Sequence, residues 1–313
     1  MSAADGKLLP DGVETSFAQI ESRMTRLAAG DRPPMAAARA LTTTATATVV
    51  AVGPCARLLE AADALRPHAR AGAIRAILVA SGDQATPSVR VTSSEIALEG
   101  LQPAFVNNAV AALRLPSLPA LVWWRGGEPG QPEDLAELAD RLVIDVENPE
   151  PIWRRIDVMA EKTAVTDLRW TGLTRWRALM AHFFDMPGVP EAAARFTRLE
   201  IKGSDPYSAR LFAAWLATSL KWHNVAVEFE EQPGEAINAV IFGNGKEELA
   251  LRRVPGSTCV EGSARLNDRE ASRIASLGEQ NLAALIGEEL RVRSHDAAFE
   301  KAVRTVGDAV HTE

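Results

Sequence analysis

The stretch TTTATATVVAVGPCARLLEAADALRPHARAGAIRAILVASG, residues 42–82, decides the fold of the first half of the chain. It begins with Thr42–Val52, where β-branched residues alternate with apolar ones as they do in a strand. Gly53-Pro54 breaks this strand, and leucines at helical spacing lead to a second apolar strand at Ile74–Ala80. This pattern predicts two parallel strands joined by a crossover helix.

The alternation of strands and helices continues towards the carboxyl terminus. Strands are expected at 89–91, 95–98, 120–124 and 142–146, and helices at 103–114, 133–140 and 151–161. Such a series predicts an open, mostly parallel sheet with flanking helices. Upstream, a helix is expected around Phe17–Leu27, and residues 1–14 are expected to be frayed because they are polar and terminal.

The second half of the chain also alternates strands and helices, but with different segments. Helices are expected at 170–184 and 207–222, and strands at 196–201, 225–231, 236–242, 248–254 and 259–266. Gly243-Asn244-Gly245 is typical of a hairpin turn, so this sheet is expected to be mixed or antiparallel. The tail from Asp268 to Val310 is predicted to be helical, with a long C-terminal helix.

These patterns predict an α/β fold with two α/β domains. Residues 1–40 form an N-terminal extension and helix, 41–165 an N-terminal α/β domain, and 166–313 a C-terminal α/β domain.

Composition narrows the classes of partner. The 313 residues include 34 Lys and Arg against 41 Asp and Glu, so the formal charge is 34 − 41 = −7. A nucleic acid or an anionic membrane needs a basic surface, so neither is expected as a partner. No apolar run is long enough to span a bilayer, and the first residues do not resemble a secretory signal. Cys55 and Cys259 lie far apart, which suits a reducing cytoplasm.

The sequence holds no coherent catalytic pattern. Its five histidines are scattered, and neither a nucleophile elbow nor a phosphate loop is present. Gly243-x-Gly245-x-x-Glu248 lacks a third glycine and lies between strands, which favours a hairpin over a phosphate site. The carboxylates of Glu228–Glu231 are interpreted as a solvated sheet face. We therefore predict no catalytic, cofactor-binding or metal-binding residues and no cofactor, although a zinc site from both cysteines and a histidine stays open.

Tryptophan and arginine are where the sequence is unusual, with seven Trp and a single Tyr. Trp123 and Trp124 end a strand and face opposite sides of it, so the strand must be central to its sheet if both rings are covered. Core packing is the favoured interpretation for each ring. A ring at the mouth of the sheet beside Arg125 would instead anchor another protein.

A second cluster occupies Trp170–Met180. At helical spacing Arg177 falls on the apolar stripe of this segment, where a buried guanidinium needs a partner. We therefore predict a structural ion pair for Arg177 with Asp167 or Asp185. Arg169 and Arg175 are expected to point towards solvent or towards a partner.

A third cluster begins at Asp205, which has the features of a helix N-cap and is followed by Pro206. Trp215 lies on one of two opposite apolar stripes of this helix. A helix that is apolar on both sides is either sandwiched in its domain or half-buried in an interface.

These clusters resemble a known family. Leu115–Pro119 running into Trp123-Trp124, then 135–146 (LAELADRLVIDV), then 167–170 (DLRW) followed by 175–179 (RWRAL) are similar to the glucose-6-phosphate dehydrogenase assembly protein OpcA. The segments 213–217 (AAWLA) and 250–253 (ALRR) are similar to it in the same order. The resemblance extends over roughly residues 40–300.

The resemblance implies a non-catalytic cytoplasmic protein of bacterial carbon metabolism. Members of the family bind glucose-6-phosphate dehydrogenase, promote its active oligomer and activate it at the entry of the oxidative pentose phosphate pathway. The family supplies no catalytic residues. As a hypothesis, the partner-binding residues are Trp123, Trp124, Arg125, Arg169, Arg175 and Trp176.

Two other classes of function remain as alternatives. An enzyme or a sensor of sugar phosphates or nucleotides would use a site at the carboxyl ends of the parallel strands. A nucleic-acid binder is disfavoured by the negative charge.

Overall fold

The structure is a computed structural model that describes residues 7–29, 45–81, 87–127, 131–222, 225–267, 269–292 and 294–309. The chain divides into two compact units, each treated separately below. Unit 1 comprises Met1–Leu168 with Asn281–Asp296, and unit 2 comprises Arg169–Gln280 with Ala297–Glu313. The division falls close to the predicted boundary at 165/166. The sequence assigns segment 281–296 to the second domain, whereas in the structure it packs with unit 1.

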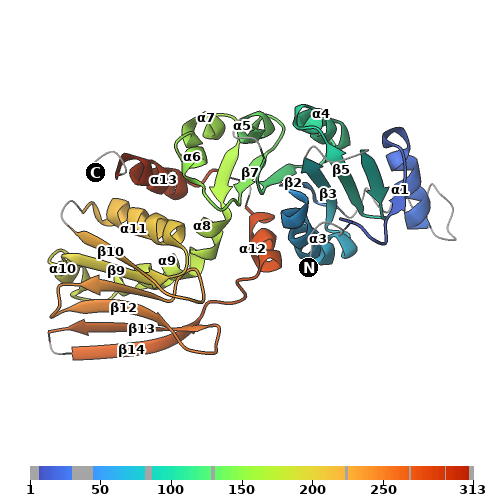
Figure 1. Cartoon of the computed structure of the whole chain (residues 1–313). Helices are drawn as coiled ribbons and strands as arrows, with labels where there is room; N and C mark the ends of the chain where they lie inside the picture. The colour runs from blue at the N-terminus through green and yellow to red at the C-terminus, as the bar shows by residue number, and fades with distance from the viewer. Residues whose placement is uncertain are drawn as a thin grey trace. The chain divides into compact units, whose positions relative to one another are not determined.

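Unit 1 is built on an eight-stranded sheet, coloured blue to green in Figure 1. Its strands are β1 (Val13–Glu14), β2 (Ala47–Gly53), β3 (Ile74–Ser81), β4 (Ser88–Val91), β5 (Glu95–Leu101), β6 (Ala120–Trp124), β7 (Arg141–Ile144) and β8 (Ala164–Asp167). They lie in the order β1-β4-β5-β3-β2-β6-β7-β8, and all neighbours from β5 to β8 are parallel. Taken in chain order, the six parallel strands have the 3-2-1-4-5-6 arrangement of a doubly wound fold. The predicted parallel sheet is confirmed.

Helices cover both faces of this sheet. They are η1 (Phe17–Gln19), α1 (Ile20–Ala29), α3 (Cys55–Arg70), α4 (Pro103–Leu113), α5 (Gln131–Ala136), α6 (Glu150–Trp153), α7 (Ile156–Ala160) and α12 (Leu282–Glu289). Leu58 of α3, Ile286 of α12 and Trp123 of β6 share one buried cluster, so α3 and α12 cover the face to which Trp123 points. Because neighbouring residues of a strand face opposite sides, Trp124 points to the other face, where α5 contacts β6 and β7.

Residues 7–14, before the first helix, are ordered, which corrects the expectation of fraying for this part, while residues 1–6 lie outside the described residues. Leu8 and Leu9 are 1% and 3% exposed and join the core of unit 1. The guanidinium of Arg90 on β4 fixes the chain by donating to the carbonyl oxygens of Leu9 at 2.9 Å and Gly12 at 2.7 Å. Two adjacent leucines in a polar stretch are enough to bury the segment once β4 supplies donors.

Unit 2 is built on a six-stranded sheet, coloured yellow to orange in Figure 1. Its strands are β9 (Arg198–Gly203), β10 (Ala226–Glu231), β11 (Ala239–Gly243), β12 (Glu248–Arg253), β13 (Cys259–Leu266) and β14 (Arg269–Ser276), in the order β10-β9-β11-β12-β13-β14. Only β9 and β10 are parallel, so the predicted mixed sheet is confirmed.

The helices of unit 2 cover one face of its sheet. They are α8 (Leu168–Gly172), which begins at the unit boundary, α9 (Thr174–Phe183), α10 (Val189–Ala193), α11 (Pro206–Leu220) and α13 (Ala297–Ala309). Leu199 and Ile201 of β9 and Phe242 of β11 are fully buried, and α11 contacts β9. The opposite face carries mainly charged and small residues.

The predicted helical tail is corrected between Asp268 and Val310. Residues 269–276 form β14, which pairs with β13 along its whole length, and the helices α12 and α13 follow. The segment REASRIAS has few residues that favour strands, so cross-strand pairing decides its structure. None of the helices among the described residues has the length and apolar character needed to cross a bilayer.

Candidate functional site at the switch point of the first sheet

The carboxyl ends of β2 and β6 lie side by side where the strand order of the first sheet reverses. From β2 the sheet continues through β3 and β5, and from β6 it continues the other way through β7 and β8. In open α/β sheets such a switch point forms the crevice in which ligands bind. The residues that follow β2, β6 and β7 therefore form the candidate site.

The turn after β2 departs from the glycine-rich turn that binds dinucleotides in this fold. That turn follows G-x-G-x-x-G, where the second glycine admits the pyrophosphate and the third allows close packing of helix and strand. Here Gly53 is followed by Cys55 and Leu58 at those two positions. Pro54 is the N-cap residue of α3 and has no N–H to donate. Leu58 is fully buried, so the features that bind phosphate are not retained in this turn.

Arg125, the residue after β6, occupies this switch point with its own side chain and is only 3% exposed. Its guanidinium donates to Asp145 Oδ2 at 2.8 Å and to Glu60 Oε2 at 2.9 Å. It also donates to the carbonyl oxygen of Arg57 and lies 4.8 Å from the ring centroid of Trp123. Nε1 of Trp123 donates to the same Asp145 oxygen at 3.1 Å. Arg125 thereby links the ends of β6 and β7 to the first two turns of α3.

Asp145, the residue after β7, is the centre of this network. Nη2 of Arg57 donates to its Oδ1 at 3.1 Å, and Nη1 of Arg57 lies 3.8 Å from Glu147. With Arg125 and Glu60 the network contains two guanidinium groups and three carboxylates, a formal charge of 2 − 3 = −1. A phosphate group would meet a site that is already paired internally and carries net negative charge.

Two buried polar side chains on the other face of β6 are left without hydrogen-bond partners in the described part of the chain. They are Nε1 of Trp124 and both amide atoms of Gln131, the first residue of α5. Both lie beside Gly127, since a β carbon there would be 3.6 Å from Nε1 of Trp124 and would touch Oε1 of Gln131. Buried polar groups are normally satisfied, so this spot suits a water molecule or one small hydrogen-bonding group.

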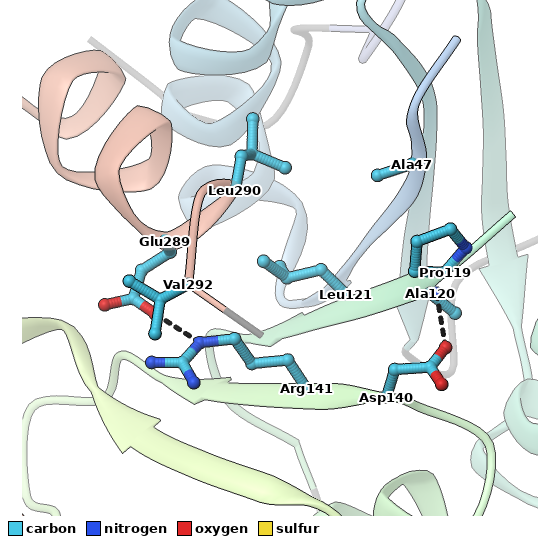
Figure 2. A pocket seen from close by; sticks show the side chains of 9 residues that line it. All are labelled: Ala47, Pro119, Ala120, Leu121, Asp140, Arg141, Glu289, Leu290 and Val292. Atoms are coloured by element: carbon cyan, nitrogen blue, oxygen red, sulfur yellow. Dashed lines mark hydrogen bonds and ion pairs between the residues drawn. The ribbon is translucent and has the colours of Figure 1, made fainter. Parts of the chain in front are cut away.

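A cavity of about 280 Å³ lies at the amino ends of β6 and β7 (Figure 2), at the edge of the sheet away from the crevice. Arg141 and Glu289 form a buried ion pair in its wall, with side chains 6% and 4% exposed. Nη1 of Arg141 also donates to the carbonyl oxygen of Ser294 at 3.2 Å, and Asp140 accepts from the backbone of Ala120 at 2.8 Å. The polar groups of this cavity thus fasten the segment around α12 to the sheet.

The first predicted partner-binding cluster is buried. Trp123, Trp124 and Arg125 are 0%, 4% and 3% exposed, because β6 is a central strand with helices on both faces. Both rings are therefore packed in the core, and none of the three residues is exposed on the surface.

The second cluster is divided between the interior and the surface. Trp176 is 3% exposed. Nε of Arg169 donates to Asp205 Oδ2 at 2.9 Å, and its guanidinium lies 5.4 Å from the ring centroid of Tyr207. Arg175 is exposed on α9. Of the six residues in the hypothesis, Arg175 alone has an exposed side chain, and its role in partner binding stays a prediction.

Arg177 packs on an aromatic ring. Its guanidinium lies 3.5 Å from the ring centroid of Trp170, and Nη2 donates to the Trp170 carbonyl oxygen at 3.3 Å. Asp167 is fully buried and accepts from Nε1 of Trp153 at 3.0 Å. The predicted carboxylate partner for Arg177, Asp167 or Asp185, stays a prediction.

The predicted N-cap of α11 is confirmed. Asp205 Oδ1 accepts from the backbone N–H of Tyr207 at 3.1 Å, which satisfies one of the free donors at the start of the helix. Trp215 on the same helix is half-buried and packs edge-on against Phe212, with ring centroids 5.3 Å apart. The capping role of Asp205 is thus structural, and the structural role predicted for Trp215 stays a prediction.

The remaining candidates of the sequence have structural roles or lack reactive features. Asn244 closes the turn between β11 and β12 by accepting from the backbone of Glu247 at 2.9 Å, which confirms the hairpin.

Partial burial, and secondarily the charge of Glu99, raises the pKa of the Cys55 thiol, whereas a reactive thiol needs a lowered pKa. Within the described ranges, no three His, Cys, Asp or Glu side chains gather as a metal site requires.

Arg57, Glu60 and Asp145 form the network with Arg125, yet no motif in the sequence marks them. A local signal exists, because Asp145 directly follows a buried strand and the other two lie in the first turns of the helix after β2. In a parallel sheet both positions belong to the edge where ligands bind.

Fold and site together define a class: a protein with a Rossmann-type unit followed by a mostly antiparallel α/β unit. The 3-ketoreductase KijD10 from Actinomadura kijaniata, solved with NADP and TDP-benzene, is similar with a TM-score of 0.52 and 10% identity over 85% of this chain and 97% of that chain. The aldose-aldose oxidoreductase from Caulobacter crescentus, complexed with glycerol, has a TM-score of 0.51 and 10% identity over 85% and 96%. At such identities the likeness concerns the fold alone.

A family model matches part of the second half of the chain. Residues 163–303 match the family described as the C-terminal domain of the glucose-6-phosphate dehydrogenase subunit. A relative from Synechocystis is 30% identical over 151 residues, 44% of this chain, and one from Nostoc punctiforme is 25% identical over 205 residues, 62% of this chain. Both are named as OpcA of the OxPP cycle. The predicted resemblance to OpcA is therefore confirmed.

The matched regions cover 31% and 44% of the length of these two relatives. The chain thus spans less than half of each curated protein.

Proposed function

We propose that this chain is a non-catalytic partner of glucose-6-phosphate dehydrogenase. It binds the enzyme, promotes its active oligomer or conformation, and so activates the entry of the oxidative pentose phosphate pathway. The family match of residues 163–303 supports this proposal, as do the relatives named for the OxPP cycle.

The observation that carries the non-catalytic part is the network around Arg125. This side chain is buried in the crevice where a Rossmann-type sheet binds its dinucleotide, and it is held by Asp145 and Glu60 at 2.8 and 2.9 Å. Opening the crevice for a ligand would leave buried charges without partners, which costs several kcal/mol. The energy that holds this crevice closed therefore opposes catalysis in it.

Activation by contact requires a preference for one state of the partner. A protein that binds the active oligomer or conformation more tightly shifts the population towards it, by no more than its ratio of affinities for the two states. The expected signs are a higher rate at low substrate concentration and a larger fraction of the active oligomer.

A titration of the cognate dehydrogenase with this chain tests the proposal. The rate at sub-saturating glucose 6-phosphate is followed together with the mass of the enzyme by light scattering. We expect a rise that saturates near a fixed molar ratio. A rate and a mass that both stay unchanged at tens of micromolar would reject the proposed function.

A second candidate function is a small-molecule sensor, favoured by the unpartnered amide of Gln131 beside Nε1 of Trp124. A ligand with a hydrogen-bonding edge would satisfy both groups. Calorimetry with NADP and with glucose 6-phosphate tests it. Binding below about 1 mM that Gln131→Met abolishes would favour the sensor over the non-catalytic partner.

A further inference from the structure

Strand β10 forms one edge of the sheet in unit 2 (Figure 1), next to β9. All six of its residues, AVEFEE, are exposed, and no described strand pairs with its outer side. Proteins usually protect such edges with charged side chains, proline, a bulge or a covering segment, because an open edge pairs readily with another chain. Of these, β10 has the charges, three glutamates that oppose pairing with another acidic edge but not with a basic segment. The regular six-residue register of β10 with β9 contains neither a proline nor a bulge.

The hydrogen bonds at the two ends of β10 show which of its backbone groups point away from the sheet. The N–H groups of Ala226 and Gln232 donate towards β9, to carbonyl oxygens at 2.9 and 2.8 Å. Because the groups alternate along a strand, those of Val227, Phe229 and Glu231 point away from the sheet. These three residues therefore offer a row of donors and acceptors along the open edge.

The same residues continue the apolar face of the sheet. Val227 and Phe229 lie opposite Leu199 and Ile201 in the register, and the latter two are fully buried beneath the helices. Val227 and Phe229 themselves are 53% and 37% exposed. Although α11 also contacts β10, the apolar face of the unit is thus only partly covered at this edge.

The charge of this edge is negative. Glu228 and Glu230 pair with Arg198 and Lys202 on the uncovered face, at 2.7 and 2.6 Å, and Glu231 adds a third carboxylate. Glu200 on β9 also lies 3.4 Å from Arg198 and 2.9 Å from Lys202, so the local balance of two cations and four carboxylates is 2 − 4 = −2. Hydrogen bonding from Lys202 lowers the pKa of Glu230, so this carboxylate stays ionised well into acidic conditions.

We propose that β10 is the docking edge for an extended segment of the partner protein, which adds to this sheet as a further strand. The segment hydrogen bonds to Val227, Phe229 and Glu231, covers the first two with apolar side chains, and places basic side chains near the carboxylates. This inference rests on the proposed function, so the partner is the dehydrogenase. A second copy of this chain is the less suitable occupant. Pairing β10 with β10 about a two-fold axis would bring two negatively charged edges together, and pairing β10 with the other open edge, β14, would propagate without closing.

Proline at position 227 removes an outward N–H and leaves the bonds to β9 intact. The matched control is Ile274→Pro on β14, the strand at the opposite edge of the sheet. The N–H of Leu277 donates to the carbonyl oxygen of Thr258, just before β13, at 2.8 Å. Because the N–H groups alternate in direction along a strand, that of Ile274 points away from the sheet. A second test variant, Val227→Lys, keeps the backbone and opposes a basic segment. The affinity of each full-length variant for the dehydrogenase is measured by calorimetry, with the fold checked by circular dichroism.

Val227→Pro and Val227→Lys are expected to weaken binding by about tenfold or more, and Ile274→Pro by less than twofold. Wild-type binding that both Val227 variants retain would overturn the docking edge and leave the proposed function standing. Failure of the wild type to bind would reject the proposed function and the edge together. If the molar mass of this chain measured alone grows with its concentration, and if Val227→Pro reduces that growth, the edge is assigned to a second copy instead. If Val227→Pro does not fold, Val227→Lys decides.

Discussion

The ion pair between Arg141 and Glu289 fixes a segment that the chain brings back to unit 1 after passing through unit 2. The helix of this segment, α12, has only eight residues and contacts α3, where Nε2 of His68 donates to the carbonyl oxygen of Ala283 at 3.1 Å. So short a helix depends on tertiary contacts. Replacing either charged partner therefore tests how the segment is held.

The size of the effect follows from burial. Both side chains are at most 6% exposed, and loss of one partner leaves a buried charge, at a cost of about 3–5 kcal/mol. The adjoining cavity of about 280 Å³ gives water access to the remaining charge, so we expect the lower end, about 3 kcal/mol, for Arg141→Met or Glu289→Leu. The double variant fills the same space with apolar groups and is expected to lie within about 1 kcal/mol of the wild type.

Hydrogen exchange of the α12 amides, followed by mass spectrometry, measures this free energy locally. Local exchange is the more direct measure for α12, because global denaturation of a chain with two units reports a unit's free energy of unfolding only where the two transitions separate. A loss of about 3 kcal/mol speeds exchange in α12 by roughly 100-fold, since each 1.4 kcal/mol is a factor of ten. The amides of β13 in unit 2 serve as the internal reference.

The coupling between the two substitutions decides the outcome. Independent effects would make the double variant lose about 6 kcal/mol, whereas pairing limits the loss to about 1 kcal/mol, a coupling of about 5 kcal/mol or more. If the acceleration of α12 amide exchange in the double variant equals the product of the two single-variant accelerations, the two substitutions act independently and the reasoning is refuted.

Three other substitutions test burial, the network and a helix cap. Burial raises the pKa of Glu95 in the folded protein above its value in the unfolded chain. As the pH rises from the unfolded pKa through the folded pKa, ionisation of this carboxyl group therefore lowers the free energy of unfolding. Glu95→Gln is expected to stabilise unit 1 at pH 7 but not below about pH 4, and equal gains at both pH values in urea titrations would contradict this. Arg125→Met removes a buried partner of Asp145 and is expected to cost about 3 kcal/mol in urea, against a negligible loss if the network were incidental. Asp205→Ala removes the cap of α11 and should cost about 1 kcal/mol in thermal unfolding, with no change if water replaces the cap.

Local patterns predicted the elements whose own residues determine them. The first strand–helix–strand unit, the central strand ending at Trp124 and the cap at Asp205 each follow from periodicity or from a single side chain with a known local role. Strand β14 and the buried pair Leu8-Leu9 depend instead on β13 and β4, which are brought to them by the fold. Their own residues carry too weak a signal.

The switch-point network was beyond prediction for a similar reason. Arg57 and Asp145 are 88 positions apart, and they meet only because β2, β6 and β7 are adjacent and parallel. Strand order cannot be read from the pattern of strands alone, so the burial of Arg125 was not foreseen. Once the order is known, the position of these residues at the carboxyl edge follows directly.

A protein that acts by contact must expose what it uses, and this condition separates the candidate surfaces. Trp123, Trp124 and Arg125 bind one another and the core, so their substitution would change stability before it changed recognition. Val227 and Phe229 show the opposite combination, with partly exposed apolar side chains and with backbone groups that point away from the sheet along its edge. They also lie within residues 163–303, the part of the chain that the family match covers. Under the proposed function, the partner surface is therefore expected in unit 2, whereas the switch-point residues of unit 1 pair with one another and stabilise its fold.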